Sequence, residues 1–283
     1  MKRRRLAALP VRTVMSAPVS FFDVVSARQQ MLNTLLCVGL DPDVSKIPQR
    51  YQVAARPVLA FCRDVIDATH DLVATFKPQF AHFAAADALG DLKEIIAYCR
   101  DLKVPVILDA KRGDVGSTSD FYAREAFDVY GADAVTVNPY LGGDSLEPFL
   151  ERADKGVILL CRTSNPGGAD LQNLKLAGGE ELYEYVAQLA ATQWNSRGNI
   201  GLVVGATRPA ELKRVREITG NMTFLLPGIG AQGGDVAASL EAGRGGGLIV
   251  SSSRAVLYPD SDAPGAVRAA AMATRDLINE HRG

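Results

Sequence analysis

The chain has 283 residues and a formal net charge of −1, from 31 basic and 32 acidic side chains. This balance excludes a global field that would recruit nucleic acid or a membrane surface, so an anionic ligand must be bound locally. The length fits either one large α/β barrel or two smaller domains.

The apolar runs, the basic N-terminal segment and the cysteines bear on the cellular compartment in which the protein works. No apolar run approaches the length of a transmembrane helix, and the basic start contains no signal-like apolar core. We predict that residues 1–17 form a flexible extension and residues 18–283 a single catalytic domain. The four cysteines, Cys37, Cys62, Cys99 and Cys161, are not spaced like the ligands of a metal site. We therefore predict that they are reduced thiols in the core of a cytoplasmic protein.

Continuous apolar runs alternate with helical patterns. A helix over residues 20–32, suited to plug the bottom of a barrel, comes first. Continuous rather than alternating apolar strands predict a parallel sheet covered by helices. Eight such runs lie at residues 35–40, 73–77, 105–109, 134–138, 156–161, 200–205, 223–226 and 247–251. The helical patterns between them include residues 58–68, 92–102, 182–195, 209–219 and 235–242.

Eight such units in this length predict a TIM barrel. A doubly wound sheet is the alternative, but its glycine-rich dinucleotide fingerprint is missing, because Leu40 is followed by Asp41-Pro-Asp43. In a TIM barrel the chemistry lies at the C-terminal ends of the strands. Those ends carry Asp41, Lys77, Asp109 with Lys111, Asn138, Ser164, Pro227 and Arg254.

The densest group of charges lies in residues 106–118. Side chains two apart on a strand share a face, so Asp109 and Lys111 are predicted to point one way and Arg112 the other. The pair could be a purely structural ion pair, but desolvating charges at the end of a buried strand is costly. Such pairs cluster at functional sites.

A helix is predicted to follow over residues 118–130. Asp114 and Thr118, four residues apart at its entrance, could share one face. The alternative is a capping role for Asp114, Ser117 or Thr118, with Ser117 and Asp120 resembling a capping box.

Two later segments suit ligand binding. Residues 162–179, with glycine pairs and Pro166, suit a loop that opens and closes over a ligand, although a disordered surface loop is the alternative. The glycine-rich segment after Pro227 can bring backbone N–H groups to a phosphate, and Arg254 can pair with it. Tight turns with a surface arginine are the alternative.

Residues 109–118, DAKRGDVGST, resemble the D-x-K-R-x-D-[IV]-x-x-T motif of orotidine 5'-phosphate (OMP) decarboxylases. The similarity runs from about Phe21 to the C-terminus and is strongest to the longer bacterial type of that family. It implies a TIM barrel that converts OMP to UMP in pyrimidine synthesis, without a metal or an organic cofactor.

The resemblance also implies roles for individual residues. Asp41 and Lys77 would bind ribose hydroxyls and order the charges, Asp109 would lie beside the substrate carboxylate, and Lys111 would protonate C6. Asp114 and Thr118 would reach the neighbouring subunit's site, which makes the active unit a homodimer. The remaining roles are contacts with the pyrimidine by Ser164, Gln232 and Pro227, and with the phosphate by Gln232, Gly233 and Arg254.

Three other functions are open at this stage. A Mg²⁺-dependent hexulose-6-phosphate synthase shares a similar core, although Arg112 and Thr118 fit the decarboxylase better. A Schiff-base aldolase using Lys111 is disfavoured because neighbouring carboxylates keep that amine protonated. A non-catalytic nucleotide-binding barrel would be expected to lack the reactive charges. His70 has no evident partner, and His82 is interpreted as a wall or core residue.

Overall fold

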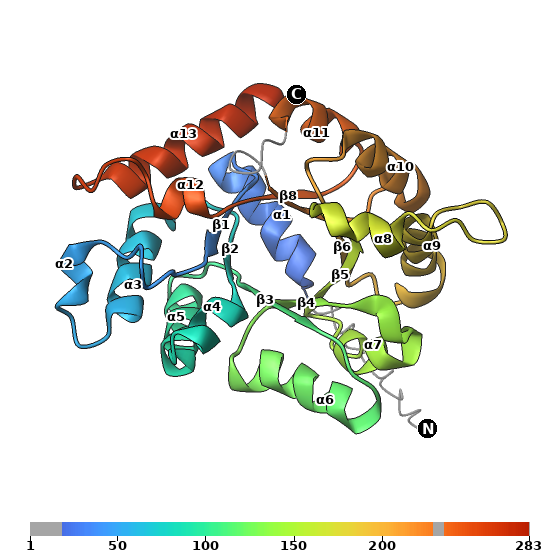
Figure 1. The fold of residues 1–283 in the computed structure, drawn as a ribbon, viewed down its shortest axis with the longest axis horizontal. Helices are drawn as coiled ribbons and strands as arrows, with labels where there is room; N and C mark the ends of the chain where they lie inside the picture. The colour runs from blue at the N-terminus through green and yellow to red at the C-terminus, as the bar shows by residue number, and fades with distance from the viewer. Residues whose placement is uncertain (1–18, 229–234, 283) are drawn as a thin grey trace, which may run out of the picture.

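The structure, a computed structural model, describes residues 19–228 and 235–282, so the predicted extension, residues 1–17, lies outside the described residues. Within the described part, strands alternate with covering helices (Figure 1). The strands are β1 (Leu36–Leu40), β2 (Thr75–Pro78), β3 (Ile107–Arg112), β4 (Ala134–Val137), β5 (Gly156–Arg162), β6 (Ile200–Val204), β7 (Phe224–Pro227) and β8 (Leu248–Ser252). The larger helices are α1 (Phe21–Leu32), α3 (Pro57–Thr69), α5 (Leu89–Asp101), α6 (Gly116–Arg124), α7 (Gly143–Leu150), α9 (Leu182–Leu189), α10 (Pro209–Thr219), α11 (Val236–Ala242) and α13 (Ala266–His281).

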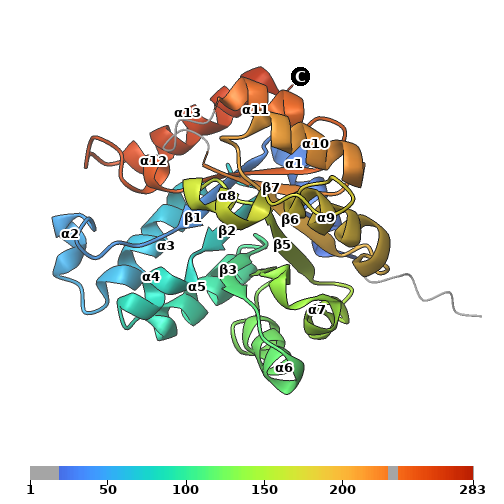
Figure 2. The same cartoon turned by 45° about the vertical axis from the view of Figure 1, so that its right-hand side comes forward.

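Short helical turns complete these connections. They are α2 (Gln49–Gln52), α4 (Phe80–Ala85), η2 (Pro139–Leu141), η3 (Pro166–Gly168), α8 (Ala169–Gln172) and α12 (Arg254–Leu257). Two π-helical segments, η1 (Glu125–Val129) and η4 (Ala190–Trp194), continue α6 and α9. The helices surround the strands in both views, and α6 lies at the edge of the molecule (Figure 2). No helix in the described part is both long and apolar enough to span a bilayer.

The eight strands form one parallel sheet in the order β2-β1-β8-β7-β6-β5-β4-β3. Its two ends meet through parallel bridges that join Phe76 to Val106 and Gln79 to Asp109. The predicted TIM barrel is therefore confirmed, and the doubly wound alternative is wrong. The strand predictions succeed to within two residues, except that β3 ends three residues later than predicted, because continuous apolar runs mark strands buried on both faces.

Helix α1 covers the N-terminal ends of the strands. Phe21 and Val25 pack with inward side chains that include Ile107 and Ile158. A Cβ on Gly156 would approach the Phe21 ring within 2.5 Å, so glycine is needed where this ring enters. The Arg28 guanidinium donates to the Val73 carbonyl just before β2. The predicted plug at the bottom of the barrel is therefore present.

The helix after β3 departs from its prediction. It begins at Gly116 rather than Thr118, and the residue that precedes it, Val115, makes no side-chain capping bond. The Ser117–Asp120 capping box is therefore wrong, since Ser117 already lies inside the helix. The last predicted turn is π-helical. The sequence did not indicate this change, because π-helical turns are rare and occur mostly as single turns within α-helices.

Candidate active site

A pocket of about 410 Å³ opens at the C-terminal ends of the strands. Its apolar floor is Leu160, Val203 and Leu225, which pack on the inner core cluster above α1. The walls are polar and come from the ends of several strands. Seven of the side chains proposed from the sequence line it: Asp41, Lys77, Asp109, Lys111, Ser164, Pro227 and Arg254.

Asp109 is the centre of the charged wall. Its Oδ2 accepts from Lys77 Nζ at 2.8 Å and from Gln79 Nε2 at 3.0 Å. Its Oδ1 accepts from Lys111 Nζ at 2.6 Å and from Thr136 Oγ1 at 2.8 Å. Four donors fix this buried carboxylate, so both ammonium groups have defined positions before any ligand binds.

The two buried members of this group stay charged. Burial alone would raise the pKa of Asp109, but attraction to Lys77 and Lys111 outweighs it and lowers the pKa well below its usual range. Burial alone would lower the pKa of Lys77, but Asp109 and then Asp41 raise it above its ordinary value. The wall is therefore an ion triad, cation–anion–cation, at neutral pH.

Lys111 reaches this position through an irregular strand. The β3–β4 register is interrupted between Leu108 and Arg112, and Lys111 has a φ of 47°, in the left-handed region. Its N–H donates to Thr136 Oγ1 at 2.9 Å. The predicted meeting of Asp109 and Lys111 occurs, but it depends on a bulge rather than on regular alternation. Positive φ in a lysine is strained, and such strain is concentrated at functional sites.

Arg112 points away from the pocket, as predicted. It forms an ion pair with Glu125 at 2.8 Å and lies over the rings of Phe80 and Tyr122. Its role is to attach α6 to the barrel wall.

The loop after β1 supports Asp41. Asp41 Oδ1 is buried and has no hydrogen-bond partner among the described residues, although it lies in the pocket lining. The Tyr258 hydroxyl accepts from the Asp43 N–H at 2.7 Å and donates to the Asp41 carbonyl at 3.3 Å. A ring nitrogen of His82 lies 3.0 Å from the Pro42 carbonyl, so this histidine supports the loop wall. An unsatisfied buried acceptor facing a pocket suits a ligand hydroxyl.

Arg254, at the start of α12 after β8, lines the same pocket. It is exposed and makes no side-chain hydrogen bond or ion pair with any described residue. Gly228 and Ser253 line the pocket beside it. The proposed phosphate contacts Gln232 and Gly233 lie outside the described residues.

Three predicted residues are absent from this pocket. Asn138, which follows β4, instead accepts from the Tyr140 N–H through its Oδ1 at 3.0 Å. Asp114 accepts from the Val115 N–H at 2.8 Å, and Thr118 is exposed on α6. Neither lines the cavity, so within one chain Asp114 does not join the triad.

Two contributors were missed. Gln79 follows Lys77 by two residues, and Thr136 is the one hydroxyl within an apolar run, residues 134–137. Strand alternation could have indicated Gln79. A single threonine in a strand gives too weak a signal, because β-branched residues are common there.

Comparison with known proteins identifies the family. A family model described as orotidine 5'-phosphate decarboxylase / HUMPS family matches residues 34–270. The chain belongs to this family. The triad lies within the matched region, so the resemblance of residues 109–118 is confirmed.

Relatives of similar length narrow the match within the family. An orotidine 5'-phosphate decarboxylase of Aromatoleum aromaticum is 55% identical over 269 residues, covering 93% of this chain and 99% of the relative. One from an Azoarcus species is 56% identical with the same coverage. The solved OMP decarboxylase of Leishmania donovani superposes with a TM-score of 0.81 at 40% identity, covering 93% of this chain and 99% of the other.

Proposed function

We propose that the Lys77–Asp109–Lys111 triad carries out the decarboxylation of OMP to UMP, the carboxy-lyase reaction of the last step in UMP synthesis. The observation that carries this proposal is Asp109, which fixes two ammonium groups at the wall of a pocket that Arg254 also lines. A nucleotide spans such a pocket with its phosphate at Arg254 and its base at the triad.

The remaining side chains bind the substrate. Asp41 and Lys77 bind the ribose hydroxyls, and this assignment is supported by Asp41 Oδ1, which has no hydrogen-bond partner among the described residues. Ser164 and Pro227 contact the pyrimidine over the apolar floor. Arg254 forms charge-assisted bonds to the phosphate together with the segment that contains Gln232 and Gly233.

The chemistry requires an ammonium at C6. The bond from C6 to the carboxylate breaks, CO₂ departs, and the electron pair stays in an in-plane orbital that no π system can accept. Lys111 stabilises this charge and then delivers its proton to C6. One charge pair at about 4 Å supplies only about 4 kcal/mol at an effective dielectric near 20. Enzymes commonly supply about 8–23 kcal/mol, so phosphate binding must contribute as well.

We further propose that the active unit is a cytoplasmic homodimer. Asp114 and Thr118 lie outside their own pocket, on a segment whose apolar side chains are exposed: Val115 at 55%, Phe121 at 64% and, after β4, Tyr140 at 76%. A second copy that covered these side chains would bring Asp114 and Thr118 towards its own site. Four buried, unpaired thiols support a reducing compartment.

The test follows pyrimidine ultraviolet absorbance after OMP is mixed with the chain in EDTA, with Lys111→Ala in parallel. We expect conversion to UMP that the substitution abolishes. If the chain instead turned over sugar phosphates, and EDTA abolished this activity while Mg²⁺ restored it, the hexulose-6-phosphate synthase reaction would be favoured.

The dimer is tested by sedimentation of the wild-type chain and of the Phe121→Glu variant. The introduced negative charge should dissociate the dimer.

A further inference from the structure

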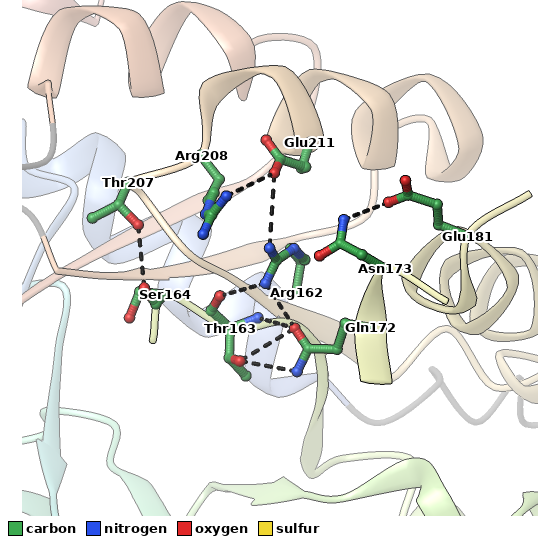
Figure 3. A network of polar contacts seen from close by, with 9 residues as sticks. All are labelled: Arg162, Thr163, Ser164, Gln172, Asn173, Glu181, Thr207, Arg208 and Glu211. Carbon is green, nitrogen blue, oxygen red and sulfur yellow. Dashed lines mark hydrogen bonds and ion pairs between the residues drawn. The ribbon is translucent and has the colours of Figure 1, made fainter. Parts of the chain in front are cut away.

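Arg162, the last residue of β5, is a fully buried cation outside the triad (Figure 3). Its Nη1 donates to the Thr163 carbonyl and to Gln172 Oε1, both at 3.0 Å. Burying an arginine is costly unless its charge and its N–H groups have partners. A fully buried arginine at the edge of a binding pocket therefore needs an explanation.

Gln172 is the point at which the loop after β5 is tied to itself. Besides the Arg162 contact, its Oε1 accepts from the Thr163 N–H at 3.0 Å, and its Nε2 donates to Thr163 Oγ1 at 2.9 Å. The end of α8 is thereby fastened to the first residue of the loop. Residues 163–172 form a closed loop rather than a free one.

This closure fixes the residue that enters the pocket. Ser164 follows Thr163 directly, and its backbone packs against Gly205, where an added Cβ would lie 2.8 Å from Ser164 Cα. Thr163, Ser164 and Asn165 all line the pocket. A shift of Thr163 would move Ser164 within the cavity, so the Gln172 contacts control the position of Ser164.

Glu211 supplies the negative charge that faces the Arg162 guanidinium. The Arg162 Nε and Nη2 atoms have no hydrogen-bond partner in the described residues, but Nη2 lies 3.8 Å from Glu211 Oε1, at the start of α10. Arg208 Nη1 lies 3.5 Å from the same oxygen. The loop is therefore joined electrostatically to the helix after β6 (Figure 3).

We infer that Arg162 and Gln172 are positioning residues that select the nucleobase by fixing Ser164 over the pocket. The inference rests on the proposed function, in which Ser164 contacts the pyrimidine. Arg162 and Gln172 touch no substrate themselves. Their loss should weaken ligands that carry a base and spare ligands that fill only the ribose and phosphate sites.

The test measures UMP and ribose 5-phosphate as competitive inhibitors of OMP turnover in Gln172→Ala. We expect the UMP inhibition constant to rise about ten-fold and that of ribose 5-phosphate to change less than two-fold. Asn173→Ala is the matched control, because the Asn173 amide in the same loop donates to Glu181 instead, at 2.6 Å. It should leave both constants unchanged.

A double-mutant cycle separates positioning from general damage. If Gln172 acts through Ser164, adding Gln172→Ala to Ser164→Ala should change UMP inhibition less than two-fold. An undiminished ten-fold effect in that background, or equal weakening of both inhibitors, would overturn the inference. Wild-type chain that fails to decarboxylate OMP would defeat the proposed function instead. Wild-type turnover with Gln172→Ala indistinguishable from Asn173→Ala would defeat only this inference.

Discussion

The two charged walls of the pocket differ in how the protein supports them. On the β2–β3 side, Asp109 accepts four hydrogen bonds, and both ammonium groups are paired within 2.8 Å. After β8, Arg254 is exposed and has no side-chain partner among the described residues. The wall around Asp109 is therefore organised in advance, whereas Arg254, the proposed phosphate contact, keeps its charge available for a ligand.

The largest effect is expected at Asp109. Asp109→Ala leaves the buried Lys77 cation without its partner, which should lower the free energy of unfolding by about 3–5 kcal/mol. Loss of the organised ammonium should lower kcat by about 10³-fold or more. Urea unfolding and steady-state kinetics measure the two effects. Asp91→Ala is the control, because Asp91 is another buried, arginine-paired carboxylate and should cost stability without changing kcat. Full kcat in Asp109→Ala would refute the organised wall.

Substitution of Arg254 should lower activity without lowering stability. Arg254→Ala removes a side chain that has no partner among residues 19–228 and 235–282, so the melting temperature should stay within about 1 °C while kcat/KM for OMP falls by roughly 10²-fold. Thermal unfolding and kinetics check this pair of values. Arg244→Ala, which alters a surface arginine paired with Glu241, should change neither. A large loss of stability in Arg254→Ala would end the contrast between the walls.

Substitution of Thr136 tests whether kcat depends on the exact positions of Asp109 and Lys111. Thr136→Val removes the hydroxyl that donates to Asp109 and accepts from the Lys111 N–H. We expect about a five-fold fall in kcat, since one net hydrogen bond contributes about 1 kcal/mol. Thr75→Val is the control, because Thr75 Oγ1 bonds the Pro105 carbonyl and not the triad. Equal kinetics in both variants would show that Thr136 has no positioning role.

The smallest effect concerns pH. Because the pKa of Asp109 is lowered by folding, its stabilising contribution is present above its ordinary pKa and is lost as pH falls below about 4. The raised pKa of Lys77 keeps its contribution intact below about pH 10. Urea unfolding between pH 3 and 6 should show a slope up to about 1.4 kcal/mol per pH unit shallower in Asp109→Asn than in wild-type chain. Arg254→Ala should keep the wild-type slope.

The barrel could be predicted because its signals are cumulative. Each strand contains or adjoins an apolar run of the sequence, and α10 matches residues 209–219 at both ends. Lys111 was harder to place, because a bulge and a positive φ set its direction, and neither is written in a two-residue alternation. The error at Ser117 has the same cause: a capping pattern is local, whereas the start of α6 is fixed by how β3 ends.

The candidate site divides along similar lines. Charged residues at strand ends, such as Lys77 and Asp109, were evident because a buried strand has little other use for them. Thr136 and Gln172 were not, since a threonine in a strand and a glutamine in a loop are ordinary. Asp114 belongs to neither group, because its proposed role requires a second copy that one sequence does not display.

The helix at the base of the barrel determines how material enters and leaves. Phe21 and Val25 occupy the N-terminal end of the barrel beneath Val203 and Leu225. Ligands therefore enter and leave the pocket only at the C-terminal end of the barrel. Under the proposed decarboxylation, CO₂ would leave through the same mouth as the nucleotide, and the proton that recharges Lys111 would arrive there too. The loop after β5, which lines the pocket with Thr163, Ser164 and Asn165, borders that route.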